Sequence, residues 1–402
     1  MKVPFFRVQI GEAERREVLE VLESGWLTTG PRVRTFEAEF AAAVGAKHAI
    51  ALNSATAALH LAVEALGLRA GEGVLVPTAT FAATAEIVRY LGAIPILVDA
   101  DPDGQIDLDD ADRAIGRLAR GELPAAIPPS TRVVGMIPVH YGGVMVDVAR
   151  ARELARARGL WMVEDAAHSF PAAYRADASS PWVRCGERTS DVTCFSFYAN
   201  KTITTGEGGM ATTDDERVAD RMRLMSLHGL SRDAWNRYQG GGWDYRIVAP
   251  GFKYNMTDVA AAVGIHQLRR AEELRRERER VARIYVEQLG DVGEIELPAV
   301  PTDRIHAWHL FPLRLRLDQL TIDRNLFIDR LNAAGIGTSV HWRPLHLHNY
   351  YAETFGWRPE HLPAASALFP RTLSIPLFAG ITDAEVGYVV ESVRRVARDH
   401  AR

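Results

Sequence analysis

Short apolar runs alternate with amphipathic segments of helical period through the first half of the chain. Strand-length apolar runs occur at residues 48–53, 73–78, 94–100, 133–140 and 161–167. Helical patterns precede or separate them, at residues 12–24, 35–45, 55–67, 82–92 and 146–159. This alternation predicts an α/β fold with a parallel or mixed sheet and helices on both faces. Ligands in such folds bind at the carboxyl ends of the strands.

The second half of the chain repeats the pattern at a smaller scale. A helix is predicted after Asp214, a long functional loop over residues 231–250, and a long helix that starts within 251–268 and continues to about residue 289. Strands are then predicted at 309–317 and 336–342, and helices at 324–335 and from 383 onwards. We therefore predict a large domain over residues 1–265 and a smaller C-terminal α/β domain over residues 266–402.

Composition narrows the class of protein. The chain has 402 residues, 47% apolar residues, 24% charged residues and a net charge of −4, which is typical of a globular enzyme and not of a nucleic-acid binder. Its two cysteines, Cys185 and Cys194, form neither a disulfide framework nor a zinc pattern. No run of about 18 apolar residues and no signal-peptide core is found, so we expect no membrane span and a cytoplasmic location.

The stretch Thr193–Asp214 contains the most informative lysine. An apolar, aromatic run predicts a buried strand, which leads directly into Lys201 and a glycine-rich loop. Burial lowers the pKa of a lysine because it disfavours the charged form, and the neutral amine is a nucleophile toward aldehydes. The alternative is an ordinary solvated lysine. Composition favours the first interpretation, since only four of the 47 basic residues are lysines: Lys2, Lys47, Lys201 and Lys253.

Two further strand ends carry polar residues. After the strand at 48–53, small residues leave the helix N-terminus and the Thr56 hydroxyl open to a phosphate, although Ser54 could be a simple N-cap. After the strand at 161–167, Glu164 and Asp165 need a cation or a proton as partner, and a structural salt bridge is the alternative. No glycine pattern matches a dinucleotide or Walker loop, so a simple phosphate is expected. A helix N-terminus open to a phosphate, a carboxylate and a lysine amine together predict a pyridoxal phosphate site.

Five stretches carry a resemblance to a known family. They are SGWLTTGPRVRTFEAEFA, LNSATAALHLA, VEDAAHS, FSFYANKTITTGEGGMATTDD and GFKYNMTDVAAAVG. They resemble the sugar aminotransferases of the DegT/DnrJ/EryC1/StrS family. The resemblance implies a fold-type-I aminotransferase that uses pyridoxal 5′-phosphate, with pyridoxamine phosphate as intermediate. It also implies a homodimer with shared active sites, with L-glutamate as amino donor.

The resemblance assigns roles to individual residues. Lys201 corresponds to the lysine that forms the Schiff base, and Asp165 to the partner of the pyridine nitrogen. His168 stands where a side chain approaches the hydroxyl side of the ring, and Phe81 where an aromatic ring stacks on the cofactor. The implied phosphate contacts are Ser54, Ala55, Thr56 and Ser196.

One position departs from the usual family pattern. Many members have GYNYR where this chain has GFKYN, so that Lys253 takes the Asn position and Asn255 the Arg position. Either residue is then expected to reach the phosphate in the neighbouring subunit. GFKYN, HAWHLF, GIGTSVHW and SIPLF resemble the branch that contains the UDP-4-keto-pentose aminotransferase of the aminoarabinose pathway. The implied substrate contacts are Trp26, Thr28, Thr29, Tyr198, His309 and His341.

The resemblance implies transfer of an amino group to C4 of a nucleotide-linked 4-keto pentose or 4-keto-6-deoxyhexose. Alternatives are a 3-keto sugar or cyclitol ketone as substrate, or a non-catalytic regulatory protein that binds the cofactor. Related sugar dehydratases have histidine at the position of Lys201, so the lysine argues against that activity. No metal is expected, because no zinc-like spacing links the clustered histidines: His306, His309, His341, His346 and His348.

Overall fold

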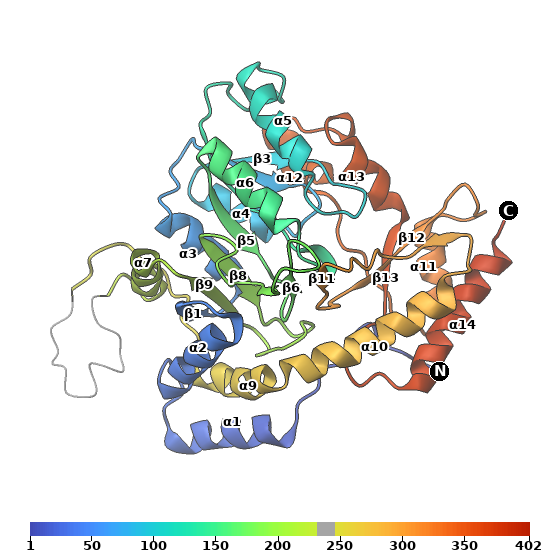
Figure 1. The fold of residues 1–402 in the computed structure, drawn as a ribbon, viewed down its shortest axis with the longest axis horizontal. Helices are drawn as coiled ribbons and strands as arrows, with labels where there is room; N and C mark the ends of the chain where they lie inside the picture. Colours follow the sequence, from blue (N-terminus) through green and yellow to red (C-terminus); the bar gives the residue numbers. More distant parts are fainter. Residues whose placement is uncertain (231–245) are drawn as a thin grey trace.

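A mixed sheet forms the centre of the molecule in the computed structural model, which describes residues 1–230 and 246–402 (Figure 1). The sheet has seven strands in the order β1-β9-β8-β5-β4-β2-β3. All neighbours pair in parallel except β9, which is antiparallel to both β1 and β8. The strands are β1 (His48–Leu52), β2 (Gly73–Pro77), β3 (Ile94–Val98), β4 (Val133–Met136), β5 (Trp161–Asp165), β8 (Val192–Ser196) and β9 (Gly209–Thr213).

Helices cover both faces of this sheet, as the sequence pattern predicts. The pair α3 and α4 lies behind the sheet in the view of Figure 1, and the pair α5 and α6 lies in front of it. Helix α9 packs against both α1 and α2, and α2 contacts β1. The bounds are α1 (Glu12–Ser24), α2 (Pro31–Val44), α3 (Ala55–Ala65), α4 (Ala83–Tyr90), α5 (Leu108–Ala119), α6 (Val148–Arg158), α7 (Glu216–Ser226) and α9 (Asp258–Arg269).

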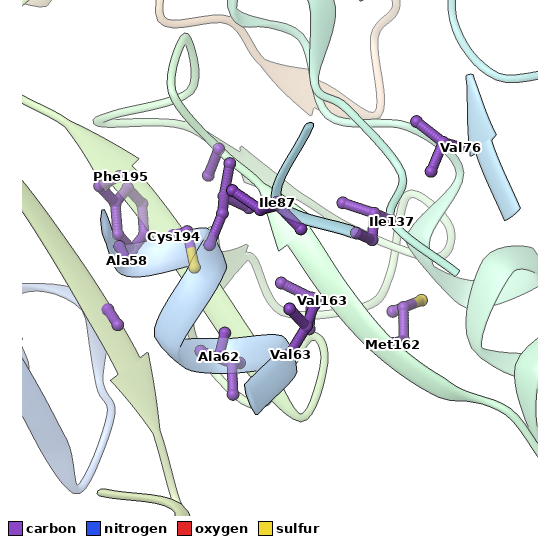
Figure 2. Close-up of a cluster of buried hydrophobic side chains, with 14 of the residues drawn as sticks. Ala58, Ala62, Val63, Val76, Ile87, Ile137, Met162, Val163, Cys194 and Phe195 are labelled. Atoms are coloured by element: carbon purple, nitrogen blue, oxygen red, sulfur yellow. The ribbon is translucent and has the colours of Figure 1, made fainter. Parts of the chain in front are cut away.

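Helix α3 is buried along most of its length, which fits its nearly continuous apolar sequence. Figure 2 shows Ala58 and Val63 of α3 among buried side chains of the sheet, such as Val163 and Cys194. Small residues on α3 allow it to lie close to β5, β8 and β9. This packing fixes the N-terminus of α3 beside the carboxyl ends of the central strands.

A second hydrophobic cluster lies around a three-stranded antiparallel sheet in the order β10-β12-β13. Helix α10 runs from α9 to this sheet and packs against α14 (Figure 1). The buried side chain of Val3 joins the same cluster, so the N-terminal segment packs on the C-terminal part of the chain. The elements are β10 (Ile295–Glu296), β12 (Phe311–Leu315), β13 (Thr372–Ile375), α10 (Ala271–Leu289), α11 (Arg324–Ala333) and α14 (Asp383–Asp399). The domain boundary between residues 265 and 266 stays a prediction.

Several smaller elements complete the fold. A minor sheet has the order β11-β6-β7. Its strands and the remaining short helices are β6 (Ala173–Tyr174), β7 (Val183–Arg184), β11 (Arg304–Ile305), α12 (Asn349–Phe355) and α13 (Pro363–Leu368). Among the described residues, no helix is both long and apolar enough to cross a membrane.

Three predictions about elements were wrong or incomplete. The predicted long helix starts only at Asp258, where Thr257 accepts a hydrogen bond from the backbone N–H of Ala260, and it is broken at Arg270. Residues 336–342 form no continuous strand, because their pairing is divided between two partners: Ile336 makes an isolated β-bridge to Val3, and Ser339 makes one to Ser374 of β13. Strand β9 and helix α5 were not predicted. The predicted loop over 231–250 lies outside the described residues except for 246–250.

Candidate active site

One cavity of about 340 Å³ lies at the carboxyl edge of the large sheet. Three strand ends converge there, namely the turn between β1 and α3, the end of β5, and the loop after β8. The structure thus brings together eleven of the residues predicted from the sequence. They are Ser54, Ala55, Thr56, Phe81, Asp165, His168, Ser196, Tyr198, Lys201, His309 and His341.

Lys201 lies in a turn that follows the buried strand β8. Its backbone N–H donates to the carbonyl of Tyr198 (2.9 Å), and its Nζ lies 3.4 Å from Nε2 of His309. Burial lowers the pKa of Lys201 to about 7, and the nearby charge of Asp165 opposes this shift. A large fraction of the amine is therefore neutral near pH 7, as nucleophilic attack on an aldehyde requires.

The carboxylate pair at the end of β5 is divided between two environments, because successive side chains in a strand point to opposite faces. Asp165 lines the cavity, where its carboxylate accepts hydrogen bonds from Thr84 Oγ1 (2.8 Å) and the N–H of Ala167 (3.1 Å). Burial raises the pKa of Asp165, and these two hydrogen bonds oppose the rise. The Asp165 carboxylate is therefore desolvated and fixed in position, and it is suited to pair with a cation in the cavity.

Glu164 has a structural role on the other side of the strand. Its fully buried carboxylate accepts hydrogen bonds from the hydroxyls of Thr189 and Thr193 and lies 3.3 Å from Nε2 of His140. Burial acts to raise the pKa of Glu164, but the contacts with His140 and the two threonines lower it overall. Glu164 therefore has structural partners away from the cavity, whereas Asp165 faces the cavity.

The N-terminus of α3 forms the opposite wall of the cavity. Ser54 Oγ accepts a hydrogen bond from the N–H of Ala57 (3.1 Å), so Ser54 is indeed an N-cap. The N–H groups of Ala55 and Thr56 belong to the first helical turn, where no intrahelical acceptor exists, and they remain suited to an anion. Gly209 allows β9 to approach this turn, since a Cβ there would lie 2.4 Å from the carbonyl carbon of Ser54.

Imidazole and indole rings form the wall nearest to Lys201. The ring of His168 stacks on Trp342 with 4.9 Å between centroids and lies 4.1 Å from the ring of His309. His168 Nδ1 accepts a hydrogen bond from the N–H of Gly142 (3.2 Å). Trp342 was not predicted, although it follows His341 directly in a stretch that the sequence analysis singled out. At the rim, Phe81 is 59% exposed and so offers an open aromatic face.

Five predicted residues do not line this cavity. Asn255 Nδ2 donates to Thr29 Oγ1 (2.7 Å), and the indole N–H of Trp26 donates to the carbonyl of Thr29 (3.1 Å). The carbonyl of Thr28 accepts a hydrogen bond from the N–H of Asp258 (3.1 Å), and Lys253 is exposed. Trp26, Thr28, Thr29 and Asn255 thus form a separate cluster beside the start of α9, whereas the Lys253 carbonyl accepts a hydrogen bond from Asn53 Nδ2 (3.3 Å).

The clustered histidines have other partners. His306 stacks on Trp308, and His346 Nδ1 lies 2.7 Å from Thr78 Oγ1. His348 Nε2 lies 3.2 Å from the carbonyl of Arg343. Within residues 1–230 and 246–402, no three His, Cys, Asp or Glu side chains are arranged to hold a metal ion.

The residues of the cavity fit pyridoxal phosphate. A neutral lysine amine, a buried carboxylate and an open helix N-terminus suit its aldehyde, its pyridine nitrogen and its phosphate, respectively. The model for the DegT/DnrJ/EryC1/StrS aminotransferase family matches residues 8–394.

The chain belongs to this family. It is 41% identical over 398 residues to the spore coat polysaccharide biosynthesis protein SpsC of Bacillus subtilis, covering 98% of this chain and 97% of that protein. It is 40% identical over 400 residues to the uncharacterized protein MJ1066 of Methanocaldococcus jannaschii, covering 99% and 98%. These matches extend over nearly the whole of this sugar aminotransferase.

A solved structure with the same fold is the PMP-form of the candidate sugar aminotransferase Spr1654 from Streptococcus pneumoniae. The TM-score is 0.87 at 31% identity, and the match covers 99% of this chain and 100% of that one. Spr1654 has also been solved in a PLP-form. The predicted fold-type-I architecture and the aminotransferase prediction are therefore confirmed, and the regulatory alternative is not supported.

Proposed function

We propose that this aminotransferase moves the amino group of L-glutamate to C4 of a nucleotide-linked 4-keto sugar. A 4-keto pentose is the first candidate and a 4-keto-6-deoxyhexose the second. The observation that carries the proposal is the cavity itself, since His309 and His341, from the HAWHLF and GIGTSVHW stretches, line it together with Lys201. These are the stretches that resemble the 4-keto-pentose branch. The name of SpsC favours a role in polysaccharide biosynthesis.

Bound pyridoxal phosphate supplies an aldehyde that takes up the amino group and a ring that withdraws the electrons released at Cα of glutamate. Lys201 Nζ is the group that would bind the aldehyde of the cofactor, and as a free amine it would remove the proton from Cα of glutamate. In the second half-reaction the same amine returns a proton to C4 of the sugar. Because burial lowers the pKa of Lys201 to about 7, the amine can both accept and donate protons near neutral pH.

Asp165 and the α3 turn hold the two ends of the cofactor. The Asp165 carboxylate keeps the pyridine nitrogen protonated, and Thr84 and Ala167 hold that carboxylate in place. The N–H groups of Ala55 and Thr56 bind the phosphate, together with the hydroxyl of Ser196. Phe81 and His168 line the same cavity, where Phe81 would stack on the cofactor ring and His168 would lie near its hydroxyl group.

The active enzyme is proposed to be a homodimer. Lys253 is exposed and lies outside the cavity of its own chain, as do Trp26, Thr28, Thr29 and Asn255. In a dimer with shared sites, these residues complete the partner's cavity. Lys253 or Asn255 then reaches the partner's phosphate, and the 26–29 segment contacts the sugar nucleotide alongside Tyr198 and His341.

The test is a panel of keto sugars. The enzyme is converted to its pyridoxamine form with glutamate and mixed with 4-keto pentoses and 4-keto-6-deoxyhexoses on uridine and thymidine carriers. The rate at which the visible absorbance of lysine-bound cofactor returns is measured. We expect the fastest return with a 4-keto pentose and modest discrimination, because one methyl group in an apolar pocket is worth about 1–3 kcal/mol. Preference for a 3-keto sugar or a free cyclitol ketone would overturn this assignment.

A further inference from the structure

A tight turn over residues 306–310 brings His309 to Lys201. Trp308, at the centre of the turn, has a φ of 51°, in the left-handed region that bulky residues disfavour. Such a conformation persists only where surrounding contacts enforce it, and it is often found at functional sites. The question is therefore what holds the turn, and what the turn achieves.

One side of the turn is held by two polar side chains. His306 Nδ1 accepts a hydrogen bond from the N–H of Trp308 (2.8 Å), and the two rings stack with 3.9 Å between centroids. The buried guanidinium of Arg278 donates to the carbonyls of Leu377 (2.8 Å) and Trp308 (3.3 Å). Arg278 therefore joins the turn to the segment that follows β13.

The other side of the turn rests on the backbone of Gly142 and Gly143. The N–H of Ala307 donates to the carbonyl of Gly143 (2.8 Å), and the N–H of Leu310 donates to that of Gly142 (3.0 Å). Gly143 has a φ of 108°, and a Cβ at this position would lie 2.9 Å from the backbone nitrogen of His309. Only glycine permits this close contact, so the turn is held from both sides.

The result is a buried imidazole in contact with the lysine amine. His309 is 4% exposed, and its Nε2 lies 3.4 Å from Lys201 Nζ. Its Nδ1 has no hydrogen-bond partner among the residues that the structure describes. Burial lowers the pKa of His309 well below the usual histidine range, so the ring is neutral and can accept a hydrogen bond.

We infer that His309 is a positioning residue for Lys201, whose Nζ donates a hydrogen bond to His309 Nε2. The inference rests on the role proposed for Lys201 above. With one N–H directed at the imidazole, the lone pair of the free amine would be left to face the cavity, where it could accept the proton from Cα of glutamate. The family resemblance implies a contact of His309 with the sugar instead, and the two roles predict different measurements.

The first test uses the cofactor-free protein. The chain has only four lysines, so lysine labelled with ¹³C at Cε yields a spectrum in which Lys201 can be assigned with a Lys201→Arg variant. An acceptor stabilises the ammonium form of Lys201, and a hydrogen bond to a charged group is worth about tenfold or more in proton affinity. Loss of this acceptor in His309→Leu should therefore lower the proton affinity of Lys201 by about tenfold or more, so that Lys201 titrates at lower pH. His309→Gln, which retains an acceptor, should restore most of it.

Other groups near Lys201 also influence its titration, namely Asp165, Arg278, His168 and His341, and all remain in these variants. His348→Gln is the control, since His348 is exposed and lies outside the cavity, and its spectrum should match wild type. Thermal unfolding of each variant reports whether the fold survives. An unchanged Lys201 titration in folded His309→Leu would overturn the inference.

The second test is the half-reaction with glutamate, which involves no sugar. With glutamate deuterated at Cα, His309→Leu should be slower, with a larger isotope effect than wild type, and His309→Gln should be intermediate. A normal glutamate half-reaction with a raised KM for the keto sugar would instead make His309 a substrate contact. A Lys201→Ala protein that still forms the lysine-bound absorbance would contradict the proposed role of Lys201, independently of His309.

Discussion

At the scale of single residues, the protonation state of Lys201 determines the pH range in which the site can bind its cofactor covalently. Burial lowers the pKa of Lys201 to about 7 from an ordinary value of 10.5, and only the neutral amine reacts. The rate at which cofactor-free protein gains visible absorbance on mixing with pyridoxal phosphate should therefore rise with pH through about 7 and level off above it.

Lys201→Arg is the matched control, because arginine stays protonated and forms no bond to the aldehyde. This variant should show no such absorbance at any pH and almost no turnover. A tenth of wild-type activity in Lys201→Arg, or a rise centred near 10, would contradict the assignment.

Asp165 and Glu164 are adjacent but should respond differently to loss of charge. Asp165→Asn is nearly isosteric but keeps only one of the two oxygens that accept hydrogen bonds from Thr84 and Ala167, and it removes the negative charge opposite the pyridine nitrogen. Since breaking a buried ion pair costs about 3–5 kcal/mol, the glutamate half-reaction should slow about 100-fold or more. Glu164→Gln should instead lower the unfolding temperature, because Glu164 pairs with His140, and leave the half-reaction of the folded protein near wild type. A half-reaction of Asp165→Asn within about twofold of wild type would refute the role of Asp165.

At the scale of elements, the phosphate site depends on how closely β9 approaches the start of α3. Gly209 pairs with Leu52 across the sheet, and a Cβ at Gly209 would lie 2.5 Å from the backbone nitrogen of Ala55. Gly209→Ala should push the two elements apart and cost about 1–3 kcal/mol of stability.

The same displacement should misalign the N–H groups that face the phosphate. Because a hydrogen bond to a charged group is worth about 1.5–3 kcal/mol, cofactor should bind about tenfold more weakly or worse to Gly209→Ala, as measured by equilibrium titration. Gly387→Ala is the control, since a Cβ there has no neighbour within 4 Å and alanine favours the helix α14. Equal cofactor affinity in Gly209→Ala and wild type would show that the close packing of β9 against the start of α3 is not needed for phosphate binding.

At the scale of the whole molecule, the proposed shared sites can be tested by mixing two inactive proteins. One carries Lys201→Ala, and the other carries Lys253→Ala with Asn255→Ala. A mixed dimer contains one site with both defects and one site with neither, so activity should return to a fraction of wild type after subunit exchange. Exchange is monitored independently with differently tagged chains. If exchange is complete and no activity returns, the 251–255 segment serves its own chain.

Local patterns in the sequence determined the large sheet, its covering helices and the polar residues at its strand ends. Strand and helix periods are short-range properties, and parallel strands bring their carboxyl ends to one edge, so Lys201 and Asp165 could be predicted to meet. Periodicity left open which carboxylate of the Glu164 and Asp165 pair faces the cavity, because that depends on what packs against each face; the family resemblance implied Asp165, and the structure places Asp165 in the cavity lining.

Long-range packing decided the rest. His309 meets Lys201 across 108 positions of the chain, and Asn255 meets Thr29 across 226. Neither contact can be predicted from the local pattern of apolar and polar residues. The extended path of residues 336–342 and the turn that carries His309 likewise follow from hydrogen bonds to distant backbone, which compete with local preference and prevail when buried polar groups must find partners.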